Sequence, residues 1–318
     1  MRIHQKEAKR IADRLEPLRL RVEMMTALWI AACGLLLLSS SSGVEGIGVN
    51  YGMISNNLPS PDKVIALCRA RNITDVRLFH PDTAVLAALR GSGLGVVLGT
   101  LNEDLVRRVV VPGDLAALVL PAMRNLESAL RGAGLGGVAV TTAVSTSVLG
   151  SSYPPSQGAF SEAALPTVGP IASFLASRSA PLLVNVYPYF AYATDPSSVP
   201  LAYTNMFDAI VDAVHAALGR VAASGGGAVD VVVSEAGWPS GGAGASVGNA
   251  AAYVNNVVRR VGSGRGTPRR AGKAVEAFVF AMFNENQKPE GVERHFGLFE
   301  PDMTEVYHVD FTAAGSPA

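Results

Sequence analysis

Short apolar runs alternate with amphipathic segments along most of the chain. The runs are rich in Val, Ile and Leu, and polar residues, Gly or Pro follow most of them. Continuous apolar runs of this length are typical of strands buried on both faces of a parallel sheet. The segments between them carry apolar residues at the 3.6-residue spacing of helices. The pattern therefore predicts an α/β fold with a parallel sheet.

Seven strands can be counted, beginning near residues 47, 75, 96, 138, 182, 229 and 275. The helices expected between them cover about residues 60–72, 85–89, 114–130, 165–175, 205–218 and 251–261. The first should begin with the Ser60 hydroxyl as N-cap and Pro61 in the first turn. The third strand should end near Leu101, the fourth should span 138–144 and the last should reach Phe283. A closed (β/α)8 barrel needs eight strands, and the pattern falters between the third and the fourth.

Composition and charge narrow the range of functions. The 318 residues are 49% hydrophobic and 16% charged, which is enough apolar material for one large core. The formal net charge is zero, so no nucleic acid or other polyanion is expected as a partner. The five His residues lack metal-ligand spacing, and neither a metal nor a cofactor is expected. A basic loop at 262–273 is interpreted as a solvated turn, and a Ser-, Pro- and Gly-rich stretch at 145–158 as a loop.

The first 46 residues are predicted to lie outside the folded domain. Residues 27–38 form an apolar stretch that is too short to cross a bilayer but suits the core of a signal peptide. The basic leader before it is long, and a start at Met24 or Met25 would give a more typical length. Cleavage would leave Cys68 as the one remaining cysteine, in a helical apolar pattern that predicts a buried, inert thiol.

A carboxylate ends the sixth predicted strand. Val231, Val232 and Val233 make a β-branched run, and Ser234 and Glu235 follow it before Gly and Pro residues stop the strand. Barrel enzymes place their catalytic residues at the carboxyl ends of strands. Trp238, three residues on, offers a flat face suited to a sugar ring. The alternative interpretation is a solvated strand-end Glu beside a packing Trp.

The stretch Ser-Glu-Ala-Gly-Trp-Pro-Ser at 234–240 resembles the signature of the plant endo-β-1,3-glucanases of glycoside hydrolase family 17. Three further stretches, at 47–52, 184–190 and 280–288, are similar to the same family and stand in its order. The resemblance runs from residue 47 to about residue 311. It implies a TIM barrel over a single domain, 47–318, that cuts β-1,3-glucan with retention of configuration. It also implies that Glu235 is the nucleophile.

The family's general acid has no counterpart in this sequence. The resemblance implies that this acid is the Glu of a Gly-Asn-Glu motif on the fourth barrel strand, and no Gly-Asn-Glu occurs here. The chain runs from Leu105 almost directly into Pro112, so about one helix–strand unit is missing. Glu103, at the end of the preceding strand, is a weak substitute. The resemblance therefore implies impaired activity.

Other site residues carry over from the same motifs. Glu285 and Lys288 match a family Glu and Lys near the nucleophile, where a cation would balance charge. The alternative for these two is a surface ion pair, worth about 0–1 kcal/mol. Five aromatic residues at or just beyond strand ends are candidates for stacking on a glucan: Tyr51, Tyr187, Phe190, Trp238 and Phe283.

Three interpretations remain open at this stage: an impaired glucanase, a glucan-binding protein that has lost catalysis, and the non-functional product of a truncated gene model. The apolar stretch at 27–38 favours secretion to the cell wall, with the vacuole as another destination. The carboxyl end has no apolar tail that would signal a lipid anchor. A monomer without a stable membrane anchor is expected, with β-1,3-glucan as its partner.

Overall fold

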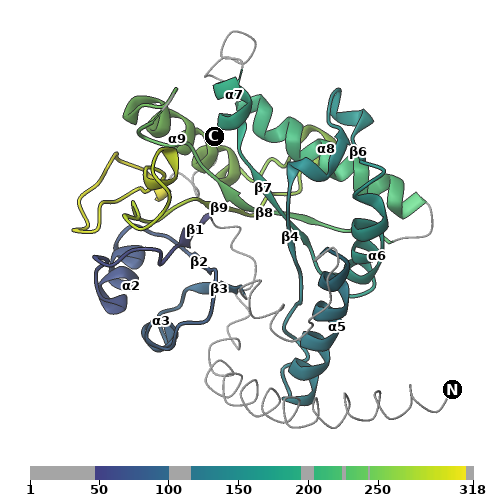
Figure 1. Ribbon diagram of the computed structural model, residues 1–318, viewed down its shortest axis with the longest axis horizontal. Helices are drawn as coiled ribbons and strands as arrows, with labels where there is room; N and C mark the ends of the chain where they lie inside the picture. Colours follow the sequence, from purple (N-terminus) through teal and green to yellow (C-terminus); the bar gives the residue numbers. More distant parts are fainter. Residues whose placement is uncertain (1–46, 100–115, 195–203, 224–226, 243, 313–318) are drawn as a thin grey trace, which may run out of the picture.

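The computed structural model describes residues 47–99, 116–194, 204–223, 227–242 and 244–312 (Figure 1). Seven parallel strands form one curved sheet in the order β3-β2-β1-β9-β8-β7-β4. The strands are β1 (Ile47–Tyr51), β2 (Asp75–Leu78), β3 (Gly95–Leu98), β4 (Ala143–Ser145), β7 (Leu182–Val186), β8 (Val231–Ala236) and β9 (Ala277–Val279). The expected α/β fold is confirmed, and the parallel sheet has seven strands among the described residues, as predicted.

The sheet is open at one place among the described residues. β3 and β4 lie at its two ends, and no ladder joins them there. This break falls between the third and fourth strands, where the sequence departs from the eight-strand pattern. The fold is therefore a (β/α) barrel sheet with an open seam between β3 and β4.

Three strand boundaries differ by three residues or more from those predicted. The fourth strand begins at Ala143 rather than at 138, because its partner β7 starts opposite Thr142 and offers no strand residue further back. The third ends at Leu98, and the residues from 100 onward lie outside the described ones. The last leaves the ladder after Val279, although the Met282 amide still donates to the Asn50 carbonyl at 2.8 Å.

Helices cover the outer face of the sheet (Figure 1). They are α2 (Pro61–Ala70), α3 (Thr83–Leu89), α5 (Ala116–Gly132), α6 (Leu165–Ala176), α7 (Pro188–Thr194), α8 (Thr204–Ala223) and α9 (Val247–Gly262). All of the expected helices are present, and α7 is an addition. The Ser60 hydroxyl makes no cap hydrogen bond; instead its carbonyl accepts from the amides of the first turn. The predicted loop at 145–158 contains β5 (Leu149–Ser151), which forms a short antiparallel hairpin with β6 (Ala159–Phe160) just after the loop.

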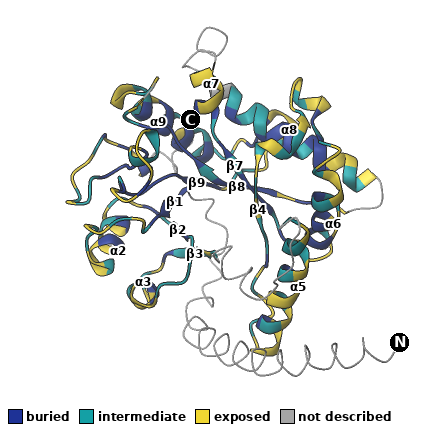
Figure 2. Ribbon diagram, viewed as in Figure 1, coloured by how far each residue is buried: buried dark blue, intermediate teal, exposed yellow. Residues whose placement is uncertain are grey.

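Burial concentrates in the middle of the sheet (Figure 2). Every residue of β1 and β9 is buried, as are all but one of β8. α9 packs a continuous apolar stripe against this region, formed by Ala250, Tyr253, Val254, Val257, Val258 and Val261. Cys68 is buried in α2, which confirms the expected buried cysteine, and burial raises the pKa of its thiol to about 12.

The signal-peptide prediction, residues 1–46, falls outside the described residues. Among the helices that are described, none combines the length and the hydropathy needed to cross a bilayer.

Candidate active site

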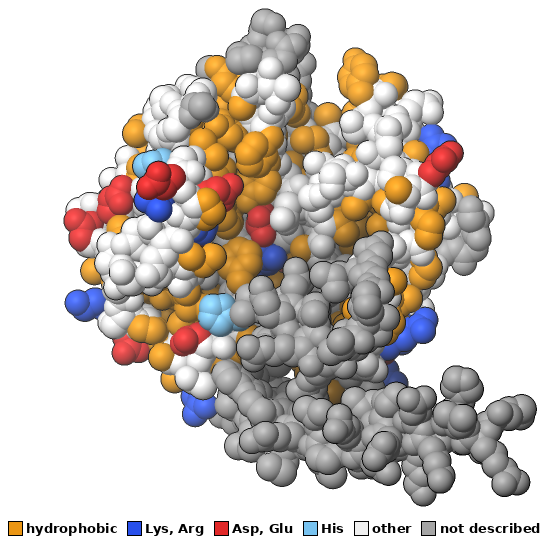
Figure 3. Space-filling model, in the orientation of Figure 1, with side chains coloured by type: hydrophobic (Ala, Val, Ile, Leu, Met, Phe, Trp, Pro, Cys, Tyr) orange, Lys and Arg blue, Asp and Glu red, His pale blue; other side chains and the backbone are white. Residues whose placement is uncertain are grey.

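Glu235 lies near the carboxyl end of β8 and is held by two donors. Arg77 of β2 donates to Oε1 at 2.7 Å, and the Tyr187 hydroxyl, just beyond β7, donates to Oε2 at 2.8 Å. The Arg77 and Glu235 side chains are mostly buried. Figure 3 shows acidic and basic side chains close together, within a largely hydrophobic surface near the centre of this face. Glu235 is thus an oriented carboxylate and not a freely solvated strand-end residue.

A buried amide fixes Arg77 in turn. Asn50 of β1 stands directly opposite Arg77 in the β1–β2 ladder, and Arg77 donates to its Oδ1 at 2.8 Å. The Asn50 Nδ2 donates to the carbonyls of Ser234 and Val279, on two further strands. The Arg77 guanidinium also lies 4.6 Å from the centroid of the Phe79 ring. Four strands therefore fix one cation beside the carboxylate.

Sequence reasoning missed both Arg77 and Asn50. The available signal for Arg77 was its charge, between Val76 and Leu78 in a strand whose apolar run predicts burial. Asn50 stood within the 47–52 motif, but its partners lie on strands remote in sequence.

Tyr187 remains a hydrogen-bond donor because its ionisation is suppressed. Burial, and then the negative charge of Glu235, raise the pKa of the Tyr187 hydroxyl well above its usual value. The charge of Glu293 acts in the same direction, while Arg77 opposes it. The neutral hydroxyl can thus hold one carboxylate oxygen at neutral pH.

Glu285 and Lys288 form a buried ion pair. The Lys288 Nζ lies 2.6 Å from Glu285 Oε2, and the Glu285 residue is 1% exposed. The Ile54 amide donates to the other oxygen at 2.6 Å, and Lys288 also lies 4.3 Å from the centroid of the Phe280 ring. The alternative of a surface ion pair is therefore corrected. A Cβ on Gly52 would come within 2.4 Å of Glu285 Oε2, so glycine is needed there.

The predicted stacking residues divide into two groups. Trp238 is 3% exposed and packs against the rings of Tyr189, Tyr192 and Tyr253 at centroid distances of 5.2–5.4 Å. Tyr51 and Phe283 are buried edge to face, 6.2 Å apart. These three rings turn inward to cover the core, which corrects the expectation that they line a cleft.

Phe190 and Tyr187 are the two candidates that remain near the carboxylate. Phe190 is 48% exposed, and its ring centroid lies 5.6 Å from that of Tyr187. A sugar-stacking role for these two stays a prediction.

Glu103, the weak substitute acid, lies outside the described residues. Within the part of the chain that the structure covers, no group of three His, Cys, Asp or Glu side chains could hold a metal ion.

A parallel barrel sheet with an oriented carboxylate at a strand's carboxyl end is typical of glycoside hydrolases with a barrel fold. Comparison with known proteins narrows this class. The model of "Glycosyl hydrolases family 17" matches residues 47–109 and 106–311. The chain belongs to this family.

Its relatives include several plant proteins. The Hordeum vulgare protein GVI is 61% identical, over 86% of this chain and 100% of its own length. The Hordeum vulgare glucan endo-1,3-beta-glucosidase GII is 41% identical, over 85% and 93% respectively. Lichenase-2 from the same species is 40% identical, over 84% and 99%.

Solved structures give the same result. The CJP38 β-1,3-glucanase of Cryptomeria japonica pollen superposes with a TM-score of 0.78 at 36% identity, covering 84% of this chain and 99% of that one. A plant beta-glucan endohydrolase gives a TM-score of 0.76 at 39% identity, with 83% and 100% covered. Identity and coverage at this level confirm the barrel fold.

Proposed function

We propose that this protein acts on β-1,3-glucan as a retaining endohydrolase with Glu235 as nucleophile. The observation that carries the proposal is the placement of Glu235 between the Arg77 guanidinium and the Tyr187 hydroxyl. The names of the glucan endo-1,3-beta-glucosidase relatives support the choice of substrate. Lichenase-2 is about as similar as GII, so overall identity leaves the choice among β-glucan linkages open.

The nucleophilic attack of the first chemical step needs only the residues around Glu235. A Glu235 oxygen attacks the anomeric carbon, the glycosidic C–O bond breaks, and the leaving oxygen departs with the bonding electrons. Arg77 and Tyr187 hold the carboxylate in position for this attack. The product is a glycosyl ester on Glu235, which water then hydrolyses. Retaining enzymes normally place a second carboxyl group about 5–5.5 Å away, to protonate the leaving oxygen and then activate that water.

We further propose that this second carboxyl group is lacking and that hydrolysis of natural glucan is slow. The sequence contains no Gly-Asn-Glu, and the described sheet is open between β3 and β4. The family match also breaks at residues 106–109. The alignment with GII spans 320 positions but includes only 85% of the 318 residues here, which leaves about 50 positions of GII unmatched. The break in the family match and the open seam of the sheet fall at the same place in the chain.

The test compares an activated with a natural substrate. A β-glucoside chain bearing dinitrophenol needs no proton on its leaving group, so it should glycosylate Glu235, detected as a mass increase on the peptide that contains Glu235. Natural β-1,3-glucan should be cut about 10²–10⁴-fold more slowly than by a relative with its acid. Glu235→Gln is the blank, and Glu103→Gln tests the weak substitute.

Two results would overturn the proposal. Fast hydrolysis of natural glucan that vanishes in Glu103→Gln would make Glu103 the acid. A folded protein that binds glucan, yet leaves Glu235 unlabelled by the activated substrate, would favour a binding protein without catalysis.

We also propose that the protein is secreted as a monomer after cleavage near residue 46. The apolar stretch at 27–38 and the Ser- and Gly-rich stretch after it support this. N-terminal sequencing of the extracellular protein tests it, and a mature chain that still carries residues 35–38 would contradict it.

A further inference from the structure

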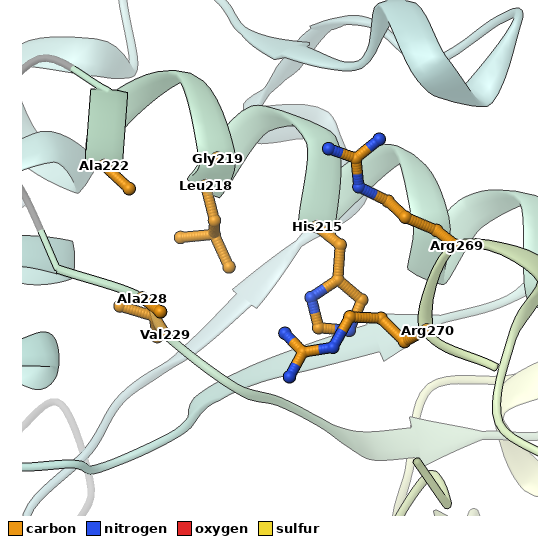
Figure 4. Close-up of a pocket in the computed structure, with 8 residues that line it drawn as sticks. All are labelled: His215, Leu218, Gly219, Ala222, Ala228, Val229, Arg269 and Arg270. Atoms are coloured by element: carbon orange, nitrogen blue, oxygen red, sulfur yellow. The ribbon is translucent and has the colours of Figure 1, made fainter. Parts of the chain in front are cut away.

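The opposite end of the barrel contains a cavity that glucan hydrolysis does not use. It has a volume of about 420 Å³ and lies between the last turns of α8, the segment entering β8, and the 3-10 helix η3 (Pro268–Arg270) (Figure 4). Val229, which lines it, precedes β8, whereas Glu235 lies near the strand's other end. Six residue steps of extended chain separate the two positions by about 20 Å. The volume falls within the range of small-molecule sites.

One side of the cavity is basic. Figure 4 shows the Arg269 and Arg270 side chains extending from η3 toward α8, with the His215 ring between them. Arg270 also pairs with Asp230 at 2.9 Å, and Lys273 pairs with the same carboxylate at 2.5 Å. The Arg269 backbone amide donates to the buried Asp212, which anchors the loop to α8. Of these charged side chains three are cations and two are anions, so a positive charge remains.

The other side of the cavity is apolar. Leu218 and Ala222 of α8 face Val229 across the space, opposite the two arginines (Figure 4). Two guanidinium groups opposite an aliphatic wall suit a ligand that has an anionic group at one end and an apolar body at the other.

A smaller adjoining hollow carries an unpaired polar group. It shares His215 and Arg270 with the main cavity and is also lined by Thr267. Thr267 is buried, and its hydroxyl has no hydrogen-bond partner among the described residues. A buried hydroxyl normally has one, so a ligand oxygen or a water that it holds would satisfy this group.

We propose that this cavity binds a small organic anion, with its phosphate or carboxylate group against Arg269 and Arg270 and its apolar body against Leu218, Ala222 and Val229. Planar guanidinium groups match the oxygen geometry of both acids. The basic loop at 262–273 is then part of a binding site and not only a solvated turn. The site requires no glucan and no catalysis at Glu235.

His215 supplies a spectroscopic reporter. Burial, followed by the charge of Arg270, lowers the pKa of its imidazole to about 4. An anion bound beside the ring would offset the Arg270 charge and raise that pKa. NMR titration of the histidine ring signals, assigned with His215→Asn, would follow this change in the full chain.

The binding test uses phenyl phosphate, benzoate and inorganic phosphate at low salt. We expect phenyl phosphate or benzoate to bind with a Kd on the order of 1 mM and to raise the His215 pKa. Arg269→Gln should weaken binding at least about 10-fold. Arg265→Gln removes the same charge from an exposed residue of the same loop, and it should change the Kd by less than about 2-fold. Ala222→Phe fills the apolar side and should abolish binding of both aromatic anions while preserving that of inorganic phosphate.

The controls separate a site from general attraction to basic residues. Equal weakening by Arg265→Gln and Arg269→Gln would overturn the proposal, as would unchanged binding of phenyl phosphate to Ala222→Phe. Absence of any shift at His215 up to tens of millimolar ligand would overturn it as well. The choice between phosphate and carboxylate follows from which aromatic anion binds more tightly. Labelling of Glu235 is measured separately, so failure here leaves the proposed hydrolysis intact.

Discussion

The middle of the sheet and its two ends differ in how completely their backbone amides and carbonyls are hydrogen-bonded. β1, β8 and β9 have a strand on each side, and nearly all of their residues are buried. Among the described residues, β3 and β4 each pair on one side, and neither strand contains a buried residue. An unpaired strand edge presents free amides and carbonyls. The proposed nucleophile, Glu235, therefore lies where the described strands are paired on both sides, and the open seam lies where the family resemblance places the acid.

This difference indicates that the two halves of the chemistry are separable. Glu235, Arg77 and Asn50 depend on β1, β2, β8 and β9, whose ladders are intact. No contact within this group requires the seam between β3 and β4. Attack by Glu235 should thus survive a defect that removes protonation of the leaving group.

Closing the seam should have the largest effect. Inserting a relative's helix–strand unit with its Gly-Asn-Glu after Leu105 should raise the rate on natural glucan by about 10²–10⁴-fold. It should also raise the melting temperature, because the edges of β3 and β4 gain partners. Glucan hydrolysis and thermal unfolding are measured on the same two proteins.

A matched insertion separates the two causes. The same unit with Gln in place of its acid should raise the melting temperature equally but leave the rate low. Unchanged melting temperatures in both insertions would mean that the barrel closes in some other way.

Arg77→Met tests whether the orientation of Glu235 and the stability of the strands around it depend on the buried guanidinium. Removing one partner of a buried pair costs about 3–5 kcal/mol. Since Arg77 and Glu235 keep some solvent contact, we expect a loss of about 2–4 kcal/mol in the free energy of unfolding. Labelling of Glu235 by the activated substrate should slow about 100-fold or more, because the carboxylate loses its orientation.

Tyr187→Phe is the milder comparison for Arg77→Met. It removes one hydrogen bond to a charged group, worth about 1.5–3 kcal/mol. An Arg77→Met protein with unchanged stability and unchanged labelling would show that the ion pair positions nothing.

A pair of truncations measures the difference in packing directly. Val233→Ala, in the fully buried part of β8, should cost about 1–2 kcal/mol, from lost transfer energy and the cavity left behind. Leu98→Ala on β3 removes more atoms than Val233→Ala. Because Leu98 is 41% exposed, the substitution should nevertheless cost less than about 1 kcal/mol. Urea unfolding gives both values. The opposite order would mean that β3 is covered in solution.

The sequence predicted elements better than contacts. Strand count, the place of the break and the strand-end position of Glu235 followed from local apolar runs and motifs. The Arg77–Glu235 contact did not, because it depends on the register of β1 with β2 and on the curvature that brings β2 toward β8. Trp238 was misplaced for a similar reason: the rings that bury it come from α7 and α9, on either side of it in the chain. Local patterns carry no signal for such packing.

The last predicted effect is a pH dependence in the packed region, where α8 covers β7 and β8. Burial and Arg270 lower the pKa of His215 to about 4, against about 6.5 in an unfolded chain. Between these two values the unfolded state binds the extra proton, so stability falls as the pH is lowered from 6.5 toward 4. One such group changes the free energy of unfolding by at most about 1.4 kcal/mol per pH unit, and above pH 7 it contributes nothing. His215→Asn should flatten the melting-temperature profile across this window. Parallel melting-temperature profiles for the unmodified chain and His215→Asn would mean that solvent reaches the His215 ring. α8 would then be less tightly packed than the strands that it covers.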